Sequence, residues 1–176
     1  MPLTVLAWSL TIAALIHIFE EFVFPGGFKA WWCAYRPEIG ASVTNRFLVI
    51  INVVLVLFSA NVALAAQTRG GNGVAAWLAL AALLAGNAVF HIVGSIQTRR
   101  YSPGIVSGIF LYIPLAVYGY VYFVRSGRAS LLTAFIAAAL GGSYYFVSAT
   151  NHRRRARARP KRPNQAMQRT APRSDA

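Results

Sequence analysis

One histidine and two glutamates lie close together in an apolar stretch near the start of the chain, where His17, Glu20 and Glu21 form the pattern H-x-x-E-E. On a helix the three side chains can share one side, because three- and four-residue spacings bring side chains together. Imidazole and carboxylate groups at this spacing can bind a divalent metal, as in H-x-x-E-H zinc sites. The pattern predicts His17 and Glu21 as metal ligands and Glu20 as the catalytic base.

A second histidine, His91, is predicted to complete the ligand set. It lies six or seven residues before the end of its own apolar stretch, at a depth similar to that of His17, and both stretches run in the same direction. Asn87 lies one helical turn deeper, and Asn52 enters from the same side to a matching depth. We therefore expect a metal held by His17, Glu21 and His91, with Asn87 and Asn52 supporting the pocket.

Two histidines and one carboxylate are common ligands of catalytic zinc and also of non-haem iron. Zinc is favoured over iron, because membrane enzymes that perform oxygen chemistry usually contain many more histidines than the three in this chain. A zinc site with Glu20 as base fits hydrolysis of a lipidic or membrane-embedded substrate by activated water.

The two adjacent glutamates are costly in an apolar helix. Insertion scales charge roughly 2.5–3.5 kcal/mol for an ionised residue at a helix centre, so two would cost about 5–7 kcal/mol. The alternative is a polar cluster that only holds helices together, but hydrogen bonds in membranes contribute about 0.6–2 kcal/mol. Ionisable groups at membrane depth therefore indicate a functional site.

The composition predicts an all-α, polytopic transmembrane helical bundle. Of the 176 residues, 57% are hydrophobic and only 12% are charged, which excludes an ordinary soluble domain. A short aromatic segment at 28–36 suits a membrane–water interface. Five spans are predicted within a membrane domain at 1–150: 3–24, 44–66, 74–97, 104–124 and 129–149.

The segment 151–176 is predicted to be a disordered basic tail, because it is rich in arginine and proline and almost without apolar residues. Next to a membrane helix it should attract anionic lipid head groups, and we expect membrane lipids rather than nucleic acid as partners. The distribution of Lys and Arg predicts an integral protein of the plasma (inner) membrane, with the amino terminus outside and the carboxyl terminus in the cytoplasm.

Three segments carry a family resemblance: HIFEE at 17–21, NAVFH at 87–91 and YSPG at 101–104. Together they resemble the HXXEE family of small multi-pass membrane proteins, over about residues 10–148. The resemblance implies this architecture and these site residues, and it supplies no reaction, because the family has no established activity. Paired glutamates are also similar to those of intramembrane prenyl-dependent proteases, but Pro25 stands where their pattern has arginine.

Two other classes of function stay open from the sequence. Buried carboxylate–histidine clusters also relay protons, so a proton- or cation-linked carrier or a ligand-binding membrane protein is one alternative. A non-catalytic assembly subunit, whose cluster docks a partner helix, is the other.

Two features between the third and fourth predicted spans, and at the start of the fourth, have structural interpretations. Arg100 and Tyr101 are expected to anchor the chain at the interface. Gly104 and Gly108 form G-x-x-x-G and are expected to serve internal helix packing.

Overall fold

The computed structural model describes residues 1–37 and 43–158, and every regular element within these ranges is a helix. The predicted all-α class is therefore confirmed. In chain order the elements are α1 (Leu3–Phe22), α2 (Phe28–Tyr35), α4 (Asn45–Thr68), α5 (Gly70–Thr98), α6 (Ile105–Ser107), the π-helical η1 (Gly108–Tyr112), α7 (Ile113–Arg125) and α8 (Leu131–Ala158).

Four of the predicted spans are long and apolar enough to cross a membrane: α1, α4, α5 and the continuous stretch Ile105–Arg125, which joins α6, η1 and α7. These four helices support a membrane protein. The apolar part of α8, Leu131–Tyr145, is about 22 Å long, shorter than the roughly 30 Å hydrocarbon core. The fifth predicted span is therefore not confirmed.

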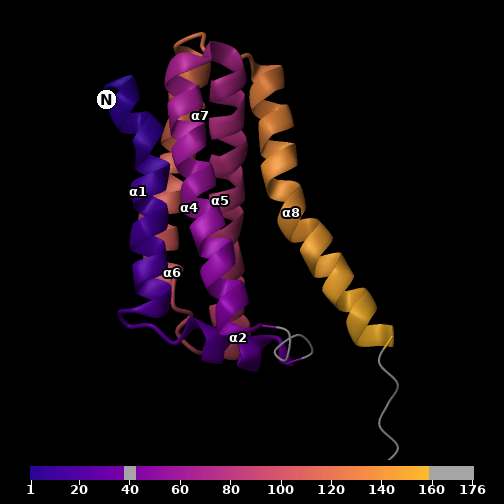
Figure 1. Ribbon diagram of the computed structural model, residues 1–176. Helices are drawn as coiled ribbons and strands as arrows, with labels where there is room; N and C mark the ends of the chain where they lie inside the picture. The colour runs from indigo at the N-terminus through magenta and orange to yellow at the C-terminus, as the bar shows by residue number, and fades with distance from the viewer. Residues whose placement is uncertain (38–42, 159–176) are drawn as a thin grey trace, which may run out of the picture.

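The spans α1, α4, α5 and α7 form an up-and-down bundle with α8 at its side (Figure 1). Helix α5 is central, because it packs against α4, α7, η1 and α8, while α1 packs against α4. Helix α2 lies across one end of the bundle, where α1 and α5 finish and α4 begins (Figure 1). We call this the α2 end.

Packing between α1, α5 and α7 centres on Trp77, which is fully buried. Its Nε1 donates a hydrogen bond to the carbonyl of Ala7 over 3.1 Å, and Gly119 approaches so closely that a Cβ there would overlap the indole. The outer face of α4 is also apolar, and Val53 and Leu57 are more than half exposed. A helix that is apolar all round is typical of a membrane span.

The connection between α4 and α5 is shorter than the gap between the predicted spans 44–66 and 74–97. Helix α4 continues through Thr68 and α5 already begins at Gly70. Gly73 allows this tight connection, because a Cβ there would overlap the backbone of Ala65. Because α4 and α5 pack against each other, the polar residues Gln67, Thr68 and Asn72 are part of the two helices rather than of a loop.

The disordered tail predicted from residue 151 is not confirmed, because α8 continues to Ala158. Alanine and arginine are strong helix formers, and no glycine or proline occurs between Gly142 and Pro160, so the helix extends past the apolar segment. The rest of the predicted tail, 159–176, lies outside the described residues.

Candidate metal centre

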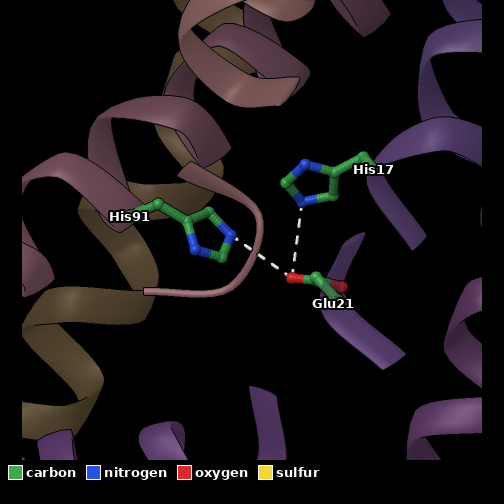
Figure 2. Close-up of side chains that lie close together, drawn as sticks. All are labelled: His17, Glu21 and His91. Atoms are coloured by element: carbon green, nitrogen blue, oxygen red, sulfur yellow. Dashed lines mark ion pairs between the residues drawn. The ribbon is translucent and has the colours of Figure 1, made fainter. Parts of the chain in front are cut away.

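Side chains from α1 and α5 converge near the α2 end: His17 and Glu21 from α1, and His91 from α5 (Figure 2). Nε2 of His17 lies 3.3 Å from Oε1 of Glu21, and Nε2 of His91 lies 3.3 Å from the same oxygen. The three residues are 2%, 6% and 0% exposed, in chain order. The structure thus brings His91 to the two α1 side chains, as their matched depths predicted.

The separations fit a shared metal ion. Zinc–ligand distances of about 2.0–2.1 Å at tetrahedral angles place neighbouring ligand atoms about 3.3 Å apart, as both His–Glu separations are. The three ligand atoms all lie within 4.8 Å of one another. Nε2 of His91 makes no hydrogen bond within the described part of the chain, and Oε1 of Glu21 is its ion-pair contact there. The group could hold a metal ion.

Ser107 sets the orientation of His17. Oγ of Ser107 lies 2.5 Å from Oε2 of Glu20 and 2.8 Å from Nδ1 of His17. A hydroxyl this close to an ionised carboxylate donates to it, so Nδ1 of His17 carries a proton and donates to Oγ. Nε2 of His17 is then unprotonated and has a lone pair, as a metal ligand requires.

His91 is held by a serine and by aromatic residues of α2. Its Nδ1 lies 2.7 Å from Oγ of Ser102, and the Ser102 N–H donates to Oγ of Ser95 over 3.1 Å. Trp31 stacks on the imidazole, with ring centroids 5.7 Å apart and planes inclined by 21°. Phe28 packs on it at 5.7 Å. Helix α2 therefore covers His91 at the α2 end.

Glu20 does not point to the meeting point of the three ligand atoms. Its Oε1 accepts from the Tyr101 hydroxyl at 2.5 Å and from the Val106 N–H at 3.0 Å. Its Oε2 accepts from the N–H of Ser107 at 2.7 Å and from the hydroxyl of the same residue at 2.5 Å. Burial raises the pKa of Tyr101, and the hydrogen bond to Glu20 raises it further. Tyr101 therefore contacts the site directly, beyond the interfacial role predicted for it.

The two predicted supporting asparagines differ in their contacts. Nδ2 of Asn87 lies 2.9 Å from Nε2 of His17, so Asn87 belongs to the cluster. Nδ2 of Asn52 donates to the carbonyl of Leu48 over 2.9 Å. Both side chains line the same cavity as His17 and Glu21.

This cavity has a volume of about 500 Å³ and lies between α1, α2, α4, α5 and α8. That size is within the range of about 300–1,000 Å³ for small-molecule sites. Apolar side chains form most of its wall, among them Phe47, Ile51, Leu55 and Phe58 of α4 and Leu83 and Phe90 of α5. A polar edge of this mostly apolar cavity thus includes His17 and Glu21, two of the three candidate ligands.

Gly104 brings the loop 99–104 against both histidines. A Cβ on Gly104 would lie 2.7 Å from Cε1 of His17 and 2.8 Å from Cε1 of His91, and the residue has φ +101°. Gly108, by contrast, packs on Cβ of Ala88, so the expected internal helix packing applies to Gly108 and not to Gly104. Only the first glycine of the pattern is part of the site.

Sequence reasoning missed Ser102, Ser107 and Tyr112 as contacts of the site. Ser102 lies in an irregular loop and Ser107 ends the short helix α6, so no sustained periodic pattern distinguishes either residue. Tyr112 ends η1, packs on His17 with ring centroids 4.6 Å apart, and is fully buried. Its hydroxyl has no hydrogen-bond partner among the described residues. Short π-helical segments occur frequently at functional sites, but the sequence does not reveal them.

Comparison with known proteins assigns the chain to a family. Residues 8–119, more than half of the chain, match the model described as "Protein of unknown function with HXXEE motif". The matched range contains all three candidate ligands and the loop that orients them. No curated protein and no solved structure shows significant similarity to the chain. The chain belongs to the HXXEE-motif family, whose function is unknown.

Proposed function

We propose that the protein is a metal-dependent membrane hydrolase that acts on a lipidic or membrane-embedded substrate. The observation that carries the proposal is the convergence of Nε2 of His17, Nε2 of His91 and Oε1 of Glu21 beside an apolar cavity. Catalytic zinc has three protein ligands and an open position, so zinc is the metal that we propose. Bound zinc supplies a Lewis acid and lowers the pKa of coordinated water to about 7.

Glu20 is assigned a positioning role in this proposal. The sequence pattern suggests it as the base, but its carboxylate already accepts hydrogen bonds from Tyr101, Val106 and Ser107. Through Ser107 it keeps Nδ1 of His17 protonated, which reserves Nε2 for the metal.

Asn87 is assigned the polar contact with the substrate. In the structure its amide donates to the Nε2 lone pair of His17 and faces the cavity. A metal on Nε2 would take that lone pair, which leaves the amide able to donate to a substrate oxygen.

The test is a paired measurement of metal content and lipid hydrolysis on detergent-purified protein. The wild type is expected to carry one zinc per chain and to hydrolyse a lipid ester, and the variant with His17→Ala and Glu21→Ala should lose both. Asn61→Ala is the matched control, because Asn61 also lies on α4 and donates to a carbonyl of its own helix, that of Leu57, over 2.8 Å, but does not line this cavity. A wild-type protein without stoichiometric metal, or a double variant with unchanged metal, rules the proposal out.

A proton-linked carrier is the second candidate, favoured by one observation. Hydrogen bonds connect the half-exposed Tyr101 through Glu20 and Ser107 to the buried His17, and such chains can pass protons. In liposomes, Glu20→Gln should then abolish ion-coupled flux in a protein that hydrolyses no lipid. Flux that is unchanged in Glu20→Gln rules the carrier out.

We propose that the α2 end faces the cytoplasm and that the metal centre lies in the cytoplasmic leaflet. The α2 end carries Lys29, Arg36, Arg46, Arg99 and Arg100, and the opposite end carries Arg69, Arg125 and Arg128. The basic segment after residue 150 would then meet anionic lipid of the inner leaflet. A reporter enzyme fused to the carboxyl terminus, active only in the cytoplasm, tests the orientation, and activity of a periplasm-dependent reporter there contradicts it.

A further inference from the structure

The cavity beside the metal group has polar side chains in two separate places. The first is the edge formed by His17, Glu21, Asn52 and Asn87, and the second is Arg36, which lines the cavity at the end of α2. The rest of the wall is mostly apolar, with Tyr35, Tyr144 and Tyr145 as its other residues that carry a hydroxyl. A ligand that is complementary to this lining therefore has two polar groups and an apolar chain.

Positions along α4 give the order of these features. The cavity wall runs along α4 from Phe47 to Phe58, a rise of about 16 Å. Asn52 lies near the middle of this stretch, and Arg36 lies at the α2 end, where α4 begins. A ligand would thus place one polar group at Arg36, a second about halfway at the metal group, and its apolar chain beyond, against Leu55 and Phe58.

Arg36 is suited to an anionic group. Its Nη2 donates to the Tyr35 hydroxyl over 3.0 Å, and that hydroxyl donates to Oε1 of Gln97 over 3.0 Å, so the guanidinium is oriented. Of the acidic residues that the structure describes, Glu20 and Glu21 are both engaged within the site, and no described carboxylate pairs with Arg36. A guanidinium with unused N–H groups binds carboxylate or phosphate well.

We propose that the cavity binds an anionic single-chain amphiphile: its carboxylate or phosphate pairs with Arg36, its polar linkage lies at the metal group, and its chain extends along α4 beyond Asn52. This names the substrate class of the hydrolase proposed above and rests on that function for the linkage. Binding of the head group and chain rests only on Arg36 and the apolar wall.

The test measures binding of three fluorescent probes with the same alkyl chain to detergent-purified full-length protein. A carboxylate and an alkyl phosphate should bind, and the neutral alcohol should bind about tenfold to a hundredfold more weakly, because it lacks the charge-assisted hydrogen bond. The tighter of the two anions identifies the head group. Alcohol that binds as tightly as both anions overturns the role of Arg36.

Matched variants separate the cavity from general surface charge. Arg36→Ala should weaken the anions to the level of the alcohol, and Arg36→Lys should keep part of their affinity. Arg46→Ala, at the same end but outside the cavity wall, should change nothing. Equal weakening by Arg36→Ala and Arg46→Ala indicates general attraction and refutes the proposal.

The chain-binding part has its own pair of variants. Val54 lines the cavity and Val53 does not, although the two are 53% and 52% exposed. Val54→Trp should therefore weaken all three probes, whereas Val53→Trp should leave them unchanged. Identical probe affinities in the two variants place the chain elsewhere.

The double variant His17→Ala, Glu21→Ala distinguishes this inference from the hydrolase proposal. It should still bind the anionic probes, because Arg36 and the apolar wall are intact. Probe binding in a wild type that carries no metal supports the amphiphile site and refutes the hydrolase. A wild type that carries stoichiometric metal and hydrolyses lipid, but shows no preference for the anionic probes, supports the hydrolase and refutes the amphiphile site.

Discussion

Glu20 and Glu21 are neighbours in the chain, yet their carboxylates serve different partners. Glu21 lies 3.3 Å from both histidines, whereas Glu20 accepts hydrogen bonds from Tyr101 of the loop and from the start of the fourth span. Successive residues on a helix point about 100° apart. One turn of α1 can therefore direct Glu21 toward α5 and Glu20 toward α6. The two substitutions to glutamine should therefore have different effects.

Glu21→Gln should abolish stoichiometric metal binding with a modest effect on stability. Glu20→Gln should retain the metal, with affinity about 10–100-fold lower because His17 loses part of its support. It should also lower stability by about 1–3 kcal/mol, because an amide NH2 would face the donors that now point at the carboxylate. Metal titration and thermal unfolding of both variants check this. Equal metal loss in the two would contradict separate roles.

Gly104→Ala should disrupt the site far more than Gly127→Ala. Both glycines have positive φ, +101° and +69°, so either alanine carries backbone strain of about 1–3 kcal/mol. Only at Gly104 would the new Cβ press on His17 and His91, while nothing lies within 4 Å of one at Gly127. We expect metal binding to be lost in the first variant and kept in the second, as read by metal analysis. Retained metal in Gly104→Ala would show that the loop is not a wall of the site.

Tyr112→Phe should leave the protein as stable as the wild type or more stable, by about 1–3 kcal/mol, because it removes a buried hydroxyl without a described partner. Tyr120→Phe is the matched control. The Tyr120 hydroxyl donates to the Leu78 carbonyl over 3.2 Å, so its loss should cost about 0.5–1.5 kcal/mol. Thermal unfolding in detergent gives both values. If Tyr112→Phe is the less stable of the two, the hydroxyl has a stabilising partner after all.

Tyr101 should make stability depend on pH at the alkaline end. Its pKa in the folded protein is raised above the ordinary value of 10.0, by burial and then by Glu20. The folded state therefore holds the phenolic proton more tightly than the unfolded state does. This contribution is complete below about pH 10 and is lost as the pH rises further. Denaturant unfolding from pH 8 upward should show the decline in wild type and a smaller one in Tyr101→Phe; parallel curves would exclude the effect.

The convergence of His17, Glu21, Asn87 and His91 could be predicted, because helical rise and direction convert sequence position into depth. The split between Glu20 and Glu21 could not, because the sequence does not state which way α1 is rotated about its axis. Both glutamates fit the same pattern until the neighbouring elements are placed.

The support from Ser102, Gly104 and Ser107 could not be predicted either. Ser102 and Gly104 lie in an irregular loop and Ser107 ends the three-residue helix α6, where no sustained periodicity relates position to direction. For helix α8, composition predicted a disordered tail from residue 151. The helix instead continues to Ala158, where local helix propensity favours it.

The π-helical segment Gly108–Tyr112 has a consequence for the angular register of the fourth span. Its hydrogen bonds enclose one more residue than those of an α-helix, and each residue of a helix turns the chain by about 100°. The segment therefore sets the rotation of Ser107, on the site side, relative to α7, which packs in the bundle. Removing one residue from it would restore an unbroken α-helix and swing Ser107 away from His17. The extra residue thus lets α7 pack in the bundle while Ser107 still faces His17.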